Sequence, residues 1–181
     1  AAVERLAARL ADRRQITMTS SCGLCGRRTI ESLRSHATAV DGQWSVTPAV
    51  LSSLPDRLRS VQAVFESTGG LHAAGLFDLA GSLQLSAEDV GRHNAVDKIV
   101  GRTLLAGQHP LDRRLLLVSG RASFELVQKA LLAGIPLIAA VSAPSSLAID
   151  LANDSGITLC GFVRGGSFNI YSHPQRVSGR V

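Results

Sequence analysis

The sequence has few aromatic residues, few cysteines and no long uninterrupted apolar run. Aromatic side chains make up 4% of its 181 residues, too few for a platform on which nucleic-acid bases stack. Its three cysteines cannot build the disulfide framework of a secreted protein, which favours a reducing compartment. No apolar run approaches the length of a membrane span. We therefore expect a cytoplasmic protein with no nucleic-acid or membrane partner.

Basic residues outnumber acidic ones. The chain has 19 lysines and arginines against 14 aspartates and glutamates, which gives a formal net charge of +5 and a pI near 9.9. This excess favours an anionic partner such as a phosphate, a nucleotide or an acidic protein surface. A chain of this length buries roughly 70% of the surface that its unfolded form exposes. We therefore expect residues 1–181 to form one domain.

The first half of the chain predicts helices, a loop and a hairpin. Residues 1–13 have apolar side chains at helical spacing, and residues 19–28, rich in Ser and Gly around two cysteines, predict a flexible loop. Thr47 and Pro48 predict the start of a helix in which Pro55 is a candidate break. The expected buried stripe of that helix is Val50, Leu51, Leu54, Leu58, Val61 and Phe65. Residues 71–86 then alternate around a glycine as two strands joined by a turn do.

The second half alternates between predicted strands and helices. We expect strands at residues 115–120, 135–143, 157–163 and 167–172, and helices at residues 123–134 and 145–156. Links of a few residues are typical of right-handed crossover units in a sheet that is covered on both faces. The sequence therefore predicts an α/β fold of three layers, in which residues 115–118 and 136–141 form parallel neighbouring strands.

The loops that follow these two strands, residues 119–123 and 142–146, are rich in hydroxyl groups, and each opens a helix. Ligands of parallel sheets bind at the edge where strands end, and helix N-termini and loop N–H groups suit phosphate. Ser119, Arg121 and Ser142 are therefore candidate phosphate-binding residues, with Arg121 as a fixed cation. The alternative is that the hydroxyl groups only cap helices, as would hold for Ser123, Ser145 and Ser146.

Two cysteines, Cys22 and Cys25, stand three residues apart in a run of small residues. Such a pair is half of a structural zinc site, and neither Cys160 nor the scattered histidines complete it, so a zinc site would have to be shared between subunits. A thioredoxin-like pair would follow a strand, whereas this pair follows a predicted helix. An exposed thiol pair beside Arg27 and Arg28, which favour the thiolate, suits a nucleophile that carries a group.

Residues 88–102 hold a dense set of polar side chains. If a helix begins near Arg92, then His93 and Asp97 lie four residues apart on one face and can pair, which would orient the imidazole and raise its pKa. We take these three residues as candidate site residues; the alternative is that polar residues simply collect at helix starts. His72 follows a Gly-Gly turn at a predicted strand start and is either a site residue or a satisfied core histidine.

Taken in order, five stretches resemble the motifs of the formate dehydrogenase accessory sulfurtransferase family: SSCGLCG, STGGLHAAGLF, EDVGRHNAVDKIVGR, SGRASFELVQKALLAGIPLIAAVSAPSSLAIDLA and TLCGFVRGGSFNIYSHPQRV. The resemblance covers the chain from about residue 17, and the joint pattern is highly specific. It implies a homodimer with a cytidine deaminase-like α-β-α fold and a mixed sheet. It also implies that Cys22 carries a persulfide, with Cys25 as its companion thiol.

The resemblance further implies a reaction and its partners. Sulfane sulfur would pass from a cysteine desulfurase to the molybdenum (or tungsten) bis-molybdopterin guanine dinucleotide cofactor, before insertion of that cofactor into formate dehydrogenase. The cofactor is thus a bound substrate, GDP is expected to mimic part of it, and no resident metal is implied. The stretch that would bind the cofactor corresponds to Phe162, Val163, Arg164, Gly165, Gly166 and Ser167.

Two departures from the family pattern are visible. Ser167 stands at a position that is commonly basic in the family, so one phosphate or guanine contact is missing or is supplied elsewhere. The family also has a further N-terminal segment, mostly strands, which fits the abrupt helical start of this chain. Two other functions stay open. A nucleotide deaminase would need H-x-E and P-C-x-x-C where this chain has HNA and GRAS, and a chaperone would bind the cofactor without transferring sulfur.

Overall fold

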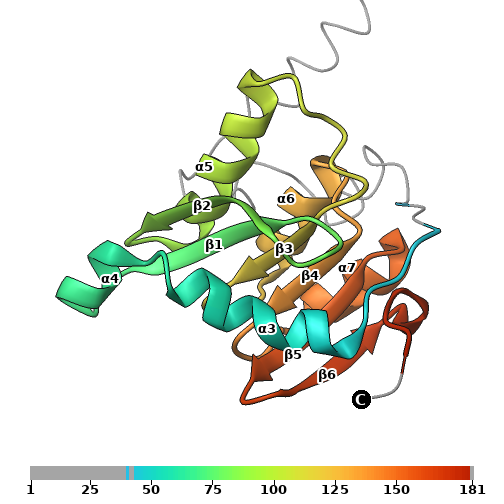
Figure 1. Ribbon diagram of the computed structural model, residues 1–181. Helices are drawn as coiled ribbons and strands as arrows, with labels where there is room; N and C mark the ends of the chain where they lie inside the picture. Colours follow the sequence, from blue (N-terminus) through green and yellow to red (C-terminus); the bar gives the residue numbers. More distant parts are fainter. Residues whose placement is uncertain (1–39, 41–42, 180–181) are drawn as a thin grey trace, which may run out of the picture. The chain divides into compact units, whose positions relative to one another are not determined.

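A mixed sheet of six strands forms the middle layer of the computed structural model, which describes residue 40 and residues 43–179 (Figure 1). The strand order is β2-β1-β3-β4-β5-β6. The three strands β3, β4 and β5 run parallel, and every other neighbouring pair is antiparallel. The strand bounds are β1 His72–Phe77, β2 Leu83–Asp89, β3 Leu115–Val118, β4 Leu137–Ala140, β5 Thr158–Arg164 and β6 Ser167–Ser172.

Helices cover both faces of this sheet. In Figure 1, α3 lies across one face, while α5, α6 and α7 lie against the other. The helix bounds are α3 Pro48–Arg59, α4 Ala63–Thr68, α5 Arg92–Leu105, α6 Phe124–Leu132 and α7 Ser146–Ser155, followed by a short 3-10 turn, η1 Pro174–Arg176. The expected α/β fold with three layers and a mixed sheet is confirmed.

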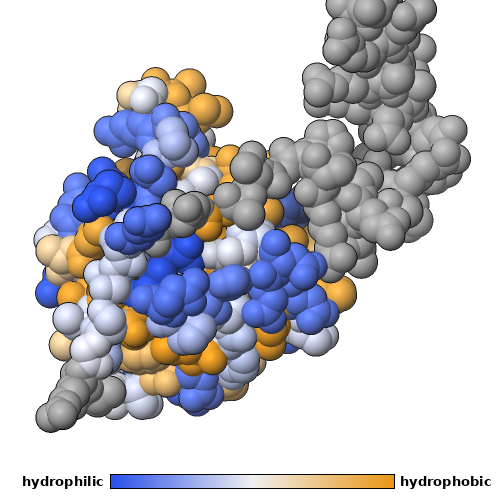
Figure 2. Space-filling model, turned by 90° about the vertical axis from the view of Figure 1, so that its right-hand side faces the viewer, coloured by the Kyte–Doolittle hydropathy of each residue, from blue (hydrophilic) through white to orange (hydrophobic). Residues whose placement is uncertain are grey.

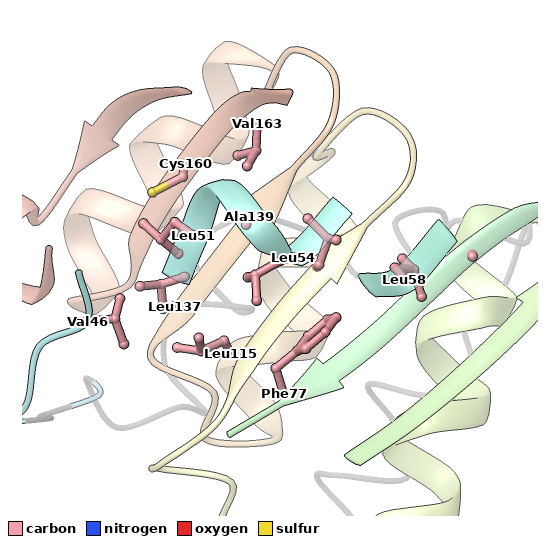
Figure 3. Close-up of a cluster of buried hydrophobic side chains, with 12 residues drawn as sticks. Val46, Leu51, Leu54, Leu58, Phe77, Leu115, Leu137, Ala139, Cys160 and Val163 are labelled. Atoms are coloured by element: carbon pink, nitrogen blue, oxygen red, sulfur yellow. The ribbon is translucent and has the colours of Figure 1, made fainter. Parts of the chain in front are cut away.

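The core between α3 and the sheet is built from one stripe of leucines. Leu51, Leu54 and Leu58 are each at most 1% exposed and point toward the strands (Figure 3). Across from them lie alternate residues of the strands, including Phe77 of β1 and Leu115 of β3. Apolar residues spaced by one helical turn in α3 thus pack against alternate residues of the strands, and burial of these side chains away from water stabilises the fold.

The start of α3 is as predicted, but its end is not. Thr47 accepts a hydrogen bond from the Val50 backbone N–H, and proline occupies the first helical turn. Pro55 does not divide the helix, which runs on to Arg59 and is followed by a break before α4. The expected stripe therefore ends early, because Val61 lies in that break and is 44% exposed.

The strands and helices of the second half confirm the sequence-based prediction. Leu115 pairs with Leu137 and Val118 with Ala140, so β3 and β4 are parallel neighbours. Their apolar runs are buried on both faces of the sheet, as expected for parallel strands covered by helices. The predicted hairpin around Gly81 is also present as β1 and β2, and the positive φ of this glycine permits the turn.

The surface carries polar and apolar groups side by side. Figure 2 shows hydrophilic residues gathered over the middle of one face, with hydrophobic residues among them in small groups. The most exposed large apolar side chain of the described residues is Leu105, near the end of α5. Within the described part of the chain, none of the helices combines the length and apolar character that crossing a bilayer requires.

Candidate functional site

The carboxyl ends of β3, β4 and β5 meet at one edge of the sheet, as their parallel pairing requires. The start of β1 reaches the same edge, because β1 runs antiparallel to β3. This arrangement brings together candidate residues from four separate segments, which we call the carboxyl edge. Its members are His72, Ser119, Arg121, Ser142 and the β5–β6 hairpin of residues 162–167.

The two loops that leave β3 and β4 are joined to each other by backbone hydrogen bonds. The N–H of Val141 donates to Val118, that of Ser142 to Gly120, and that of Ser145 to Ala122. These N–H groups are therefore occupied inside the protein, although the sequence suggested loop N–H groups as phosphate donors. These three N–H groups are therefore not available to an anion.

Several hydroxyl groups at this edge also have structural partners. The Ser119 hydroxyl accepts a hydrogen bond of 2.8 Å from the Ala73 N–H, which fixes β1 beside β3. Ser145 caps α7 through the Ala148 N–H, as the alternative interpretation held. Ser123 stands at the N-cap of α6, but its side chain makes no cap hydrogen bond.

The β5–β6 hairpin is shaped by a tight backbone contact. A Cβ on Gly161 would lie 2.8 Å from the Pro144 ring, so only glycine fits there, and the next residue, Phe162, adopts a positive φ of 54°. Its N–H donates to the Ser142 carbonyl oxygen. The guanidinium of Arg164 lies 5.7 Å from the centre of the Phe162 ring. The hairpin thus presents a cation on an aromatic face at the carboxyl edge.

The other residues of this hairpin divide into buried and exposed ones. Val163 is buried in the core cluster beneath α3, so only its backbone can reach a ligand. Gly165 and Gly166 both have positive φ and make the turn, which Ser52 of α3 contacts through the Gly166 carbonyl oxygen. Ser167 is exposed and donates to the Arg164 carbonyl oxygen.

The start of α5 at Arg92 is confirmed, but the predicted pair of His93 with Asp97 is wrong. His93 Nε2 lies 2.9 Å from Ser123 Oγ and 3.6 Å from a carboxylate oxygen of Glu125, both in the first turn of α6 or just before it. Asp97 forms its ion pair with Lys129 further along α6. Because α5 packs beside α6, His93 and Asp97 each contact residues at or in α6 and do not pair with each other.

The charge of His93 also differs from the prediction. Burial lowers the pKa of His93 below its ordinary value, and the neighbouring Arg92 guanidinium lowers it further. Burial, the largest single influence, raises the pKa of Glu125, but hydrogen bonds from Ser123 and the backbone together with the charges of His93 and Arg92 outweigh it, so that pKa lies below its ordinary value. A neutral His93 that donates Nε2–H to Ser123, whose hydroxyl donates to Glu125, satisfies all three groups.

Arg92 brings an incompletely satisfied cation to the carboxyl edge. Its Nε is buried and has no hydrogen-bond partner within the described residues. A Cβ on Gly120 would lie 3.3 Å from the His72 ring and 3.7 Å from Arg92 Cδ, so both residues lie close to the loop after β3. Arg92 therefore lies beside His72 and Gly120, where an anion would satisfy its Nε.

The start of α5 is anchored by a second set of charges. Asp89 accepts hydrogen bonds from the Gly91 N–H and the Asn94 side chain, and it forms an ion pair of 2.6 Å with Lys98. The hydrogen bond from Lys98 is the main cause that lowers the pKa of Asp89 to about 2. Asp89 thus fixes the turn before Arg92, a structural role.

Of the three cysteines, only Cys160 belongs to the described residues. Its side chain is fully buried in the core, and burial raises the pKa of its thiol to about 12. It therefore stays a thiol at neutral pH and does not act as a nucleophile. Cys22 and Cys25, with the loop of residues 19–28, lie outside the described residues. Within the described part, no three His, Cys, Asp or Glu residues are grouped so that they could hold a metal ion.

A pocket of about 550 Å³ opens beside the carboxyl edge, and sequence reasoning missed most of its wall. It lies between the break after α3, the helix α4 and the ends of β3 and β4. Gln62 could have been found as a polar residue four positions after Leu58, where the apolar stripe should continue. The wall consists of Pro55, Asp56, Arg59, Gln62, Phe65, Gly69, Gly70, Leu71, His72, Ser119 and Val141.

Proteins of known sequence resemble the chain over most of its length. It is 56% identical over 176 residues to the sulfur carrier protein FdhD of Streptomyces avermitilis, which covers 93% of this chain and 61% of that protein. It is 52% identical over 162 residues to the protein of the same name from Mycobacterium tuberculosis, covering 88% of this chain and 59% of that protein. The chain therefore spans about three fifths of the length of these curated relatives.

A solved structure agrees with the sequence comparisons. The crystal structure of a proposed formate dehydrogenase accessory protein from Desulfotalea psychrophila has a TM-score of 0.72 and 31% identity, covering 82% of this chain and 62% of that one. The model of the FdhD/NarQ family matches residues 1–178. On the combined grounds of fold, sequence and family model, the chain belongs to the FdhD/NarQ family.

Proposed function

We propose that this chain transfers sulfur, as a cysteine persulfide, to a guanine dinucleotide form of the molybdenum or tungsten cofactor of formate dehydrogenase. Relatives named sulfur carrier proteins and a structural relative described as a formate dehydrogenase accessory protein support the reaction class. The observation that carries the substrate is the carboxyl edge, which brings the segments that carry His72, Arg92, Arg121 and Arg164 to the same end of the sheet.

The sulfur step falls to Cys22. Its thiolate attacks the outer sulfur of a persulfide on a cysteine desulfurase; the new S–S bond forms on Cys22, and the desulfurase cysteine leaves as a thiolate. The Cys25 thiolate then attacks the inner sulfur, which forms a disulfide between the two cysteines and releases the outer sulfur as hydrosulfide for the cofactor. Arg27 and Arg28 favour the thiolate forms that both steps need.

The cofactor binds through its phosphates at the carboxyl edge. Arg121 is exposed and forms no hydrogen bond or ion pair within the described residues, so its guanidinium is available to a phosphate. The buried Arg92 Nε gains a partner when an anion is bound. The backbone N–H groups of Ser142 and Ser145 are already used, so in this proposal the two arginines provide the positive charge. In this proposal the protein acts in the cytoplasm as a homodimer.

Mass spectrometry tests the sulfur step. After incubation of the Cys25→Ser variant, in which no second thiol can release the sulfur, with a cysteine desulfurase and cysteine, we expect the peptide that contains Cys22 to gain the mass of one sulfur atom, which dithiothreitol then removes. Cys160 should gain none, because its buried thiol is protonated. A protein that stays unmodified on Cys22, while a known persulfide acceptor in the same tube is labelled, would overturn the transfer proposal in favour of a binding chaperone.

A further inference from the structure

We infer that the 550 Å³ pocket beside the carboxyl edge binds the 2-amino-4-oxopyrimidine ring shared by guanine and pterin, through Gln62 and Asp56, with the ring stacked on Arg59. This inference rests on the proposed function, since both rings belong to the proposed substrate. It adds a site for a ring to the phosphate contacts of the edge. The volume lies within the range of pockets that hold small ligands.

Gln62 is the first reason to expect a ligand. The residue is only 6% exposed and lines the pocket, yet its side-chain amide makes no hydrogen bond within the described residues. Its donors and acceptor are therefore available to a ligand in the pocket. The amide offers one acceptor and two donors on the same group. One of its N–H groups can donate to the carbonyl oxygen of a ring in the pocket.

Asp56 provides the complementary acceptor. It lies in α3 one turn before Arg59, lines the same pocket, and its carboxylate has no ion pair or hydrogen bond within the described residues. A carboxylate accepts from the ring N–H, which is N1–H in guanine and N3–H in pterin, and from the 2-amino group beside it. Adenine carries no N1–H and no 2-amino group, so this wall selects against it. The pair of Gln62 and Asp56 thus reads a pattern of donors and acceptors, not merely a flat ring.

Arg59 and Phe65 form the stacking surface. The guanidinium of Arg59 lies 4.2 Å from the centre of the Phe65 ring, and both residues line the pocket. A guanidinium that lies over one aromatic ring offers its other face to a second planar ring. The position of Phe65 is fixed in turn, because Glu88 of β2 accepts hydrogen bonds from the N–H groups of Val64 and Phe65.

The charges in the pocket favour a ring over a phosphate. Asp56 would repel a phosphate next to Arg59, whereas Arg92 and Arg121 lie at the edge outside this wall. His72 and Ser119 line the pocket and also belong to the carboxyl edge, so the two sites are contiguous. A nucleotide can therefore place its base in the pocket and its phosphates at the edge.

Calorimetric titration of the purified protein with GDP, IDP and ADP tests this assignment. We expect Gln62→Leu and Asp56→Asn each to weaken GDP binding tenfold or more, as loss of a hydrogen bond to a charged or buried group does. IDP lacks the 2-amino group, so the preference for GDP over IDP should disappear in Asp56→Asn. Glu66→Gln, in the neighbouring turn of α4 but outside the pocket wall, should bind GDP as the parent does.

A second titration separates the two sources of the ring. If 6-hydroxymethylpterin competes with GDP and loses affinity in Gln62→Leu, the pocket takes the shared ring; if it does not compete, guanine is the occupant. If only the pterin loses affinity in Gln62→Leu, the occupant is the pterin. Circular dichroism confirms that each variant is folded. Unchanged affinity for both compounds in both pocket variants overturns this inference.

These experiments also distinguish failure of the ring-binding inference from failure of the proposed sulfur transfer. Loss of GDP binding in Arg121→Ala, with normal binding in Gln62→Leu and Asp56→Asn, would remove the ring site and leave the phosphate edge in place. Loss in the pocket variants, together with a Cys22 that takes up no sulfur, would keep the ring site and reject the transfer reaction.

Discussion

Ser123 Oγ lies 2.9 Å from Nε2 of His93, which joins the start of α6 to the start of α5 across thirty residues of sequence. The serine stands at the N-cap position, yet its hydroxyl contacts the imidazole and the Glu125 side chain and makes no cap hydrogen bond to the backbone of α6. The contact fixes one ring nitrogen of His93 and holds the imidazole between Arg92 and Glu125. This relationship leads to a testable statement about the charge of the imidazole.

We expect His93 to be neutral at pH 7 and to titrate below the ordinary pH range of histidine, because burial and Arg92 lower its pKa. The unfolded chain then takes up this proton at a higher pH than the folded one. The free energy of unfolding should therefore fall as the pH drops from about 6.5 through the folded-state pKa. NMR titration of the imidazole and urea unfolding at several pH values measure both effects. His93→Gln should flatten this part of the pH dependence, and a His93 pKa above the ordinary value would contradict the assignment.

Arg121→Ala and Arg164→Ala should each weaken GDP binding while the fold stays intact. A hydrogen bond to a charged group contributes about 1.5–3 kcal/mol, which corresponds to roughly a ten- to hundredfold loss of affinity. Arg113→Ala provides the matched control, because Arg113 is equally exposed but precedes β3, at the opposite end of the strand. Equal GDP affinity in all three variants would remove the phosphates from the carboxyl edge.

The two paired cysteines should fail in different ways when replaced by serine. Cys22→Ser should take up no sulfur from the desulfurase, because a neutral hydroxyl is a far weaker nucleophile and forms no persulfide. Cys25→Ser should still be labelled on Cys22, but the sulfur should stall there. Both variants should bind GDP normally and yield inactive formate dehydrogenase in a maturation assay. Active enzyme from both variants would show that neither thiol transfers sulfur.

Leu54→Ala should destabilise the protein strongly. Leu54 is fully buried in the cluster between α3 and the sheet, so its truncation leaves a cavity that costs about 2–5 kcal/mol of unfolding free energy. Val61→Ala is the control, since Val61 is 44% exposed and its truncation should change the unfolding free energy by about 0.5 kcal/mol or less. Denaturant unfolding measures both. A small effect of Leu54→Ala would mean that the site collapses around the missing side chain.

The sheet and most helices were predictable because their signals are local. Apolar runs such as residues 115–118 and helix starts such as Thr47 with Pro48 need no distant partner. The end of α3 was not predictable in the same way. The turn that begins α4 is held by Glu88, which belongs to β2 and lies more than twenty residues along the chain. The apolar stripe alone therefore extended the helix too far.

In the candidate site, too, features that depend on local sequence were predictable, and contacts between distant segments were not. Sequence order and parallel pairing placed Ser119, Arg121 and Ser142 at one edge, as the structure has them. The partners of His93 and Asp97 were missed, since the rule for contacts within one helix takes no account of a second helix alongside. The pocket wall was missed for a similar reason. Gln62 can be identified as a pocket residue only when the positions of α4 and of the ends of β3 and β4 are known.

The backbone hydrogen bonds that join the loops after β3 and β4 have a consequence for affinity. Because Val118, Gly120 and Ala122 each accept a bond from the neighbouring loop, the backbones of the two loops are held to each other without a ligand. A ligand that binds there need not order these loops, so little conformational entropy is lost in the backbone. What remains to be ordered is a small number of arginine side chains. In this site the hydrogen-bonded backbone gives the loops their shape, and the arginine side chains adjust to the ligand.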